Sequence, residues 1–120
     1  MPLNGTIAAL RLWAALGASC ALLGCATAPV AVHDLADQCG SLSSVPAVHA
    51  EVEFVNQSDE DRDLNWIPAS SDRTVNYAQI PAGSSRQQPS YIGHFWVLEA
   101  RGKVRSSFCV REVRERHVSN

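Results

Sequence analysis

The stretch that decides the fold class is Ala47-Val48-His49-Ala50-Glu51-Val52-Glu53-Phe54-Val55-Asn56. Apolar side chains at positions 48, 50, 52 and 54 alternate with polar side chains at positions 49, 51 and 53. Because successive side chains of a β-strand point to opposite faces, this alternation predicts a strand with one buried face and one solvated face.

Five further strands are expected downstream, at residues 64–68, 74–80, 84–88, 94–100 and 104–111. Pro81-Ala82-Gly83 and Arg101-Gly102-Lys103 have the composition of tight turns between them. Short strands at intervals of about ten residues predict an all-β fold, a small antiparallel β-sandwich of about six to seven strands. The charged segment 112–120 is expected to fray at the end of the chain.

The first 24 residues have the pattern of a secretion signal. Arg11 precedes the apolar run 12–23, which has about half the length needed to span a bilayer. The run ends in Leu22-Leu23-Gly24-Cys25, which resembles the bacterial lipobox. By that resemblance residues 1–24 are a lipoprotein signal peptide and Cys25 receives the lipid; an ordinary cleaved signal peptide is the alternative.

This resemblance implies a lipid-anchored protein of the bacterial cell envelope, facing the periplasm or the cell surface. Ala26, rather than the Asp typical of inner-membrane retention, favours the outer membrane. Residues 25–46 are rich in Ala, Ser, Pro and Val without a sustained period, and we expect a flexible tether there. The sandwich domain is expected at residues 47–118.

The cysteines predict one disulfide. With Cys20 in the signal and Cys25 lipidated, Cys39 and Cys109 remain as an even pair in an oxidising compartment. A Cys39–Cys109 bond would pin the second half of the tether to the domain. Two unpaired thiols, with Cys109 simply buried on its strand, are the alternative.

Charge and motif content exclude several function classes. The net charge is −2, so the chain offers no basic field for nucleic acid. His33, His49 and His117 have no metal-ligand spacing with one another or with the cysteines, so we expect no metal. A nucleophile elbow is missing as well, and we expect no cofactor, no catalytic residue and no enzyme activity.

The stretch Ser90-Tyr91-Ile92-Gly93-His94-Phe95-Trp96 concentrates aromatic rings, an imidazole and a hydroxyl. On one strand, Ser90, His94 and Trp96 would share a face, provided that Gly93 introduces no bulge. Phe95 and Val97 would point the other way, into a core. The shared face suits the binding of a small polar group, and it equally suits a core cluster whose polar groups are satisfied internally.

Five motifs along the chain resemble the β domain of the von Hippel–Lindau tumour suppressor family. The resemblance covers about residues 45–110, and the order and approximate spacing of the motifs agree. The motifs are Phe54-Val55-Asn56-Gln57-Ser58, Trp66-Ile67, Tyr77, Ile80-Pro81-Ala82-Gly83 and the stretch 90–96. The resemblance implies a seven-stranded sandwich that binds a hydroxylated proline within an extended peptide. The pocket residues that it implies are Trp66, Tyr77, Ser90, His94 and Trp96.

The chemistry implied by this resemblance is consistent with the residue types. Aromatic faces can clamp a pyrrolidine ring, and a serine hydroxyl and an imidazole can donate to and accept from the ligand's hydroxyl. The family's helical domain is absent from this chain, so no ubiquitin-ligase partner is expected. A structural envelope lipoprotein with no small-ligand site is the alternative function. An open groove lined by Trp66, Tyr77 and Trp96 would favour binding, and a sealed cluster would favour the structural role.

Overall fold

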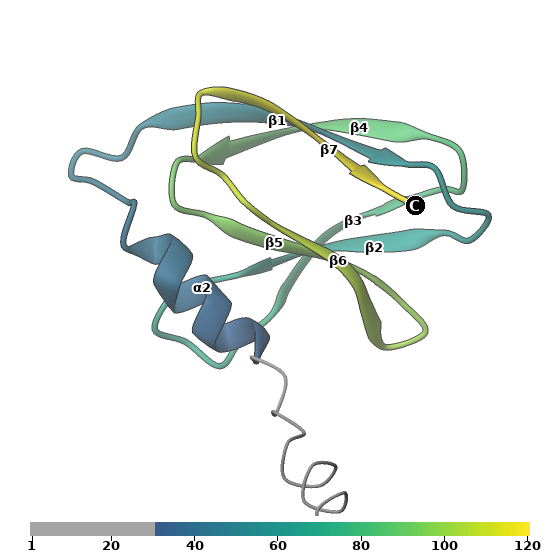
Figure 1. Cartoon of the computed structure of the whole chain (residues 1–120), viewed down its shortest axis with the longest axis horizontal. Helices are drawn as coiled ribbons and strands as arrows, with labels where there is room; N and C mark the ends of the chain where they lie inside the picture. The colour runs from purple at the N-terminus through teal and green to yellow at the C-terminus, as the bar shows by residue number, and fades with distance from the viewer. Residues whose placement is uncertain (1–30) are drawn as a thin grey trace, which may run out of the picture.

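The computed structural model describes residues 31–120, so the predicted signal peptide and the predicted lipidation of Cys25 lie outside the described residues. Seven strands form two sheets (Figure 1). One sheet has the order β4-β1-β7 and the other the order β3-β2-β5-β6. Their bounds are β1 His49–Asn56, β2 Arg62–Ile67, β3 Val75–Ile80, β4 Ser85–Tyr91, β5 Phe95–Ala100, β6 Lys103–Cys109 and β7 Arg114–Ser119. The prediction of a small all-β sandwich is confirmed.

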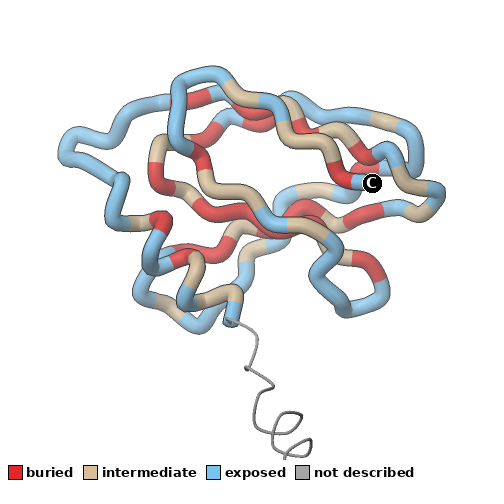
Figure 2. Tube along the Cα trace, viewed as in Figure 1, coloured by how far each residue is buried: buried red, intermediate tan, exposed pale blue. Residues whose placement is uncertain are grey.

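The main core lies between the two sheets. From β1 come Ala50, Val52 and Phe54, three of the four side chains that the alternation at 47–56 predicts to be buried; the fourth, Val48, precedes β1 and is exposed. The opposing sheet contributes Leu64, Ile80, Trp96 and Leu98, and Val110 completes the cluster. Figure 2 shows the buried segments of the two sheets facing each other. Burial of these apolar side chains is the dominant stabilising contribution to such a sandwich.

A helix replaces most of the second half of the expected flexible tether. α2 (Val32–Gly40) lies against the outer face of the four-stranded sheet (Figure 1). Val32, Leu35, Ala36 and Cys39 have the spacing of one helical face, and all four pack against Ile67, Phe95 and Val97. The prediction of a tether through residue 46 is therefore wrong for residues 32–40, because a four-residue apolar stripe suffices for a short helix that packs on a sheet.

The prediction that Phe95 and Val97 point away from Trp96 into a core is confirmed. These residues are buried, but they lie under α2 on the outside of the sandwich rather than in the core with Phe54. Alternation along β5 sends Trp96 and Leu98 to the main core instead. Both faces of β5 are therefore covered, which explains its nearly continuous apolar sequence.

The C-terminal segment forms a strand rather than fraying. β7 pairs with β1 in parallel, from Glu51 opposite Arg114 to Asn56 opposite Ser119. Hydrogen bonds then join β7 to the opposite sheet: Ser106 Oγ donates to Ser119 Oγ over 2.9 Å, and the buried Arg62 donates to the same Ser119 oxygen. The prediction of fraying is wrong because the arginine side chains of this segment lie on the exposed face of a strand.

The predicted disulfide is confirmed. Cys39 of α2 and Cys109 at the end of β6 are bonded, with their Cα atoms 5.7 Å apart. The bond closes a separation of 70 residues and fixes α2 to the four-stranded sheet.

Candidate functional site

The five residues expected to form a pocket lie together although they come from five different segments. Trp66 is on β2, Tyr77 on β3, Ser90 on β4, Trp96 on β5 and His94 in the turn between β4 and β5. The ring of Trp66 stacks on that of His94 with centroids 4.9 Å apart and an interplanar angle of 20°. Tyr77 approaches Trp96 edge to face at 5.1 Å and Trp66 at 6.4 Å.

Ser90, His94 and Trp96 do not share the face of one strand, contrary to the prediction from their spacing. Ser90 ends up in one sheet and Trp96 in the other, because the chain turns at Ile92 and Gly93. Gly93 has φ +95°, a conformation that favours glycine, and the His94 N–H closes the turn on the Tyr91 carbonyl over 3.1 Å. Ser90 and Trp96 then meet across the sandwich, where the Trp96 indole N–H donates to Ser90 Oγ over 2.9 Å.

A bulge determines the position of Tyr77. In the pairing of β2 with β3, Leu64 is opposite Ala78 and Asn65 is opposite Asn76, so Tyr77 is the extra residue. Bulges bend a strand locally and redirect a side chain. Here the Tyr77 side chain turns toward Trp66 and Trp96 while remaining 46% exposed.

The five residues fall into a buried layer and an accessible layer. Trp96 is only 1% exposed and Ser90 3%, so these two residues form the floor. Trp66 and His94 are half-buried, and Tyr77 is exposed. The arrangement is therefore neither a sealed cluster nor a groove lined by all five residues: three ring systems reach the surface above a closed base.

The His94 imidazole is available for a ligand. No hydrogen bond joins its ring to another residue between 31 and 120, although Trp66 stacks on one side and Tyr91 lies 5.2 Å away at 51°. Burial lowers the pKa of His94 below its usual 6.5, so the ring is neutral at pH 7. A neutral imidazole has one donor nitrogen and one acceptor nitrogen, which suits a hydroxyl ligand.

Sequence reasoning missed the continuation of this surface beyond His94. Tyr91 contacts His94, and the ring of His49 lies 4.5 Å from that of Tyr91. Next to His49 is an open cavity of about 240 Å³, lined by His49, Ala50, Glu51, Val113 and Arg114. Tyr91 lies within the aromatic stretch and could have been suspected, but the neighbourhood of His49 depends on the β1–β4 register.

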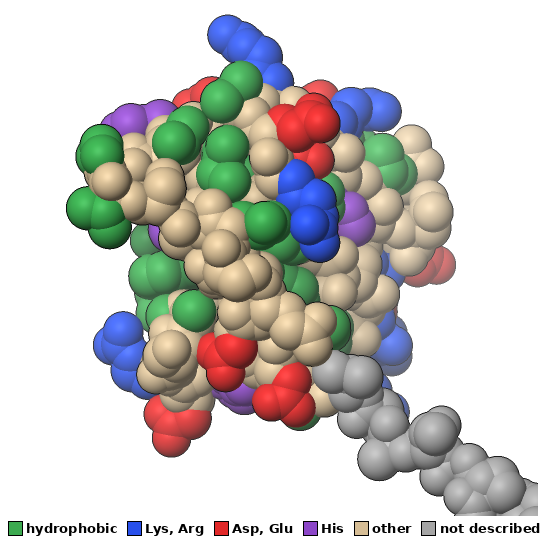
Figure 3. Space-filling view, turned by 60° about the vertical axis from the view of Figure 1, so that its left-hand side comes forward, with side chains coloured by type: hydrophobic (Ala, Val, Ile, Leu, Met, Phe, Trp, Pro, Cys, Tyr) green, Lys and Arg blue, Asp and Glu red, His purple; other side chains and the backbone are tan. Residues whose placement is uncertain are grey.

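Other site types receive no support from the described residues. Between residues 31 and 120, no group of three or more His, Cys, Asp or Glu side chains could hold a metal ion. Across the same residues, no helix combines the length and the apolar character that membrane crossing requires. Figure 3 shows one face of the molecule, where exposed apolar side chains lie in small groups among polar ones.

Comparison with other proteins adds no assignment. No protein-family model matches the chain, and no curated protein matches it at a significant level.

Proposed function

We propose that this chain is a lipid-anchored binding protein of the bacterial cell envelope, in which Trp66, Tyr77 and His94 bind a small cyclic or hydroxylated group. The favoured ligand is an extended peptide containing proline or hydroxyproline. The observation that carries the proposal is the His94 ring, which lies flat against Trp66 at the surface without a hydrogen bond to any other residue between 31 and 120.

Each residue has a distinct role in the proposal. The accessible parts of Trp66 and Tyr77 bury the apolar ring of the ligand, and a His94 nitrogen accepts a hydrogen bond from its hydroxyl. Ser90 already accepts a hydrogen bond from Trp96, and its burial suits a role in holding the floor more than in touching the ligand. The role of Ser90 is therefore narrower than the family resemblance implies.

Binding without catalysis is the proposed activity. Among residues 31–120, no carboxylate is hydrogen-bonded to His94 to orient it as a base, and Ser90 contacts Trp96 rather than His94. An activated nucleophile needs a base within hydrogen-bond reach and a third group that orients the base.

The proposed anchor would hold the domain close to the membrane. Because α2 begins at Val32, only six residues lie in sequence between Cys25 and this helix. Six residues span at most about 20 Å when fully extended. Mass spectrometry of the mature N-terminus tests the anchor: lipidated Cys25 is expected, and an unmodified terminus downstream of Cys25 would refute it.

Calorimetric titration of the full chain with matched proline and hydroxyproline peptides tests the ligand. We expect the hydroxylated peptide to bind more tightly by about 1–3 kcal/mol, since the unhydroxylated peptide leaves the polar groups of the site unpaired. Tyr77→Ala should weaken binding of both peptides. Val104→Ala is the matched control, because Val104 is 43% exposed on β6, close to the 46% of Tyr77.

A structural envelope lipoprotein is the second candidate function. The observation that favours it is the closed floor of the site, where Trp96 packs against Phe54 and donates a hydrogen bond to Ser90. If this function is the correct one, neither peptide binds. Titration into the full chain and into Tyr77→Ala then gives no heat of binding.

A further inference from the structure

Trp66 and His94, whose rings stack, lie near the end of one strand and just before the start of another. Trp66 is the penultimate residue of β2, and His94 lies in the turn before β5. β2 and β5 are paired, but the register opposite Ile67 stops at Phe95. His94 is therefore outside the β2–β5 ladder, and its backbone is held from the other side by Val110, in line with the β5–β6 pairing of Phe95 with Cys109.

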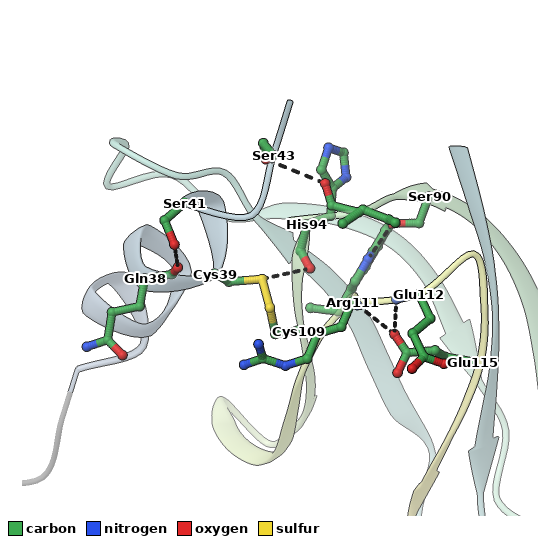
Figure 4. Close-up of a disulfide and its surroundings, with 12 residues drawn as sticks. Gln38, Cys39, Ser41, Ser43, Ser90, His94, Cys109, Arg111, Glu112 and Glu115 are labelled. Carbon is green, nitrogen blue, oxygen red and sulfur yellow. Dashed lines mark hydrogen bonds between the residues drawn. A yellow bond between two sulfur atoms is a disulfide. The ribbon is translucent and has the colours of Figure 1, made fainter. Parts of the chain in front are cut away.

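The His94 peptide is held by two segments that the disulfide joins. Val110 N–H donates to the His94 carbonyl over 3.0 Å, and Gly93 N–H donates to the Val110 carbonyl over 2.9 Å. Cys39 Sγ lies 3.3 Å from the same His94 carbonyl (Figure 4). Two groups therefore contact the His94 carbonyl, the Val110 N–H and Cys39 Sγ. The disulfide joins them, because Cys39 is bonded to Cys109 and Cys109 is the residue before Val110.

The segment after α2 packs directly on the same turn. Ser43 Oγ lies 3.5 Å from the Ile92 carbonyl (Figure 4). A Cβ added to Gly93 would come within 2.7 Å of the Ser43 backbone nitrogen, closer than real Cβ atoms approach such a neighbour. The turn therefore has no free space on the side of Ser43.

The helix also contacts the chain that follows Trp66. Asp37 Oδ1 accepts a hydrogen bond from the Ser70 N–H over 2.5 Å, in a turn where Ser70 has φ +59°. A Cβ on Gly40 would lie 2.6 Å from Ala69 Cβ, so the helix end and this turn are closely packed. Ile67, the neighbour of Trp66, is buried beneath α2.

We propose that α2 and residues 41–43, locked by the Cys39–Cys109 disulfide, form a clamp that positions Trp66 and His94 against each other. Asp37, Cys39 and Ser43 are then positioning residues: Asp37 acts on the Trp66 side, and Cys39 and Ser43 act on the His94 side. The clamp itself follows from the contacts above, and only its consequence for ligand affinity rests on the proposed function.

Proton NMR of the histidine rings tests the clamp without any ligand. A ring stacked on the face of Trp66 has its proton signals shifted upfield by the indole ring current, and loss of one signal set in His94→Gln assigns them. In Cys39→Ala/Cys109→Ala we expect the His94 ring signals to lose this shift and the pKa of His94 to move toward its usual value. His117 packs on Phe54 and Phe108 on the main-core side of the sheet, away from α2, so its signals should shift less than those of His94.

Two further variants keep the test decisive. Val52→Ala, in the main core, is the matched control for lost stability, and it should leave the His94 signals in place. If the double cysteine variant does not fold, Asp37→Ala keeps the disulfide and removes only the contact with Ser70; it should reduce the upfield shift in part. Unchanged His94 signals in the folded double variant, or in Asp37→Ala when the double variant does not fold, would overturn the clamp.

Peptide binding measurements distinguish a failure of the clamp from a failure of the proposed function. If the hydroxyproline peptide binds the native chain, we expect its affinity to fall at least about tenfold in the double cysteine variant and to be unaffected in Val52→Ala. If the peptide does not bind the native chain, the proposed function fails while the ring signals still decide whether the clamp exists.

Discussion

His94 and His117 are half-buried histidines with opposite surroundings. His117 Nε2 lies 3.1 Å from Ser106 Oγ, and the ring packs between Phe54 at 6.1 Å and Phe108 at 5.0 Å. His94 has no hydrogen bond from its ring to residues 31–120 and lies flat on Trp66 at the surface. Burial lowers the pKa of both rings, so desolvation alone does not distinguish them.

The difference between them lies in where the hydrogen-bonding capacity of each ring is used. His117 belongs to a chain of contacts that runs through Ser106 and Ser119 to the buried Arg62, and this chain joins the two sheets. Nε2 of His117 is satisfied within the protein, which is the usual condition of a buried polar group in a structural residue. The His94 ring has no such partner among residues 31–120, and under the proposed function it would hydrogen-bond to the ligand.

The largest expected effect separates the floor of the site from its accessible layer. Trp96→Ala should lower the free energy of unfolding by about 3–5 kcal/mol, because it empties a fully buried position next to Phe54. Trp66→Ala, at the half-buried position, should cost clearly less. Urea denaturation of the two variants measures both values, and equal losses would assign Trp66 to the core.

An intermediate effect should separate the two histidines. His117→Ala should lower the free energy of unfolding by about 1–3 kcal/mol, since it removes the hydrogen bond with Ser106 and the packing of the ring on Phe54 and Phe108. His94→Ala should cost less than about 1 kcal/mol, as it breaks no internal hydrogen bond of the ring. The comparison fails if His94→Ala proves the more destabilising variant in the same denaturation experiment.

The sequence was sufficient to predict the sandwich, most of the strands and the disulfide. Alternation of side chains at 47–56 is a local property, and Cys39 and Cys109 were the pair that remained once Cys20 and Cys25 were assigned to the predicted signal and lipid site. It was not sufficient for α2, because nine residues carry too short a periodic pattern to stand out from a tether. β7 was missed for a related reason: its parallel partner, β1, is more than 50 residues away in sequence.

The candidate site was predicted for a partly wrong reason. Parity along one strand cannot describe residues 90–96, because the turn at Gly93 carries the chain from one sheet to the other. The family resemblance supplied the grouping that local periodicity could not. Two features decide which of the five residues are accessible: the bulge at Tyr77 and the hydrogen bond between Trp96 and Ser90. Neither feature can be predicted from the spacing of residues in the sequence.

The smallest expected effect is a dependence of stability on pH. Because the folded-state pKa of His117 and of His94 lies below 6.5, the unfolded chain binds protons first as the pH falls. The free energy of unfolding should therefore be constant above pH 7.5 and decline from about pH 6.5 down to the folded-state pKa values. His117→Gln keeps a polar group near Ser106 without this titration, and denaturation of that variant between pH 7.5 and 5.5 should show a shallower decline. A decline as steep as in the native chain would assign the pH dependence to other groups.

The central claim, that His94 reads a ligand while His117 serves the fold, is tested most directly by one set of titrations. Hydroxyproline and proline peptides are titrated at pH 7.5 into the native chain, His94→Ala and His117→Ala, each at a temperature where the variant is folded. We expect the preference for the hydroxylated peptide, about 1–3 kcal/mol in the native chain, to be lost in His94→Ala and kept in His117→Ala. An equal preference in all three proteins, or no binding of either peptide to the native chain, would contradict it.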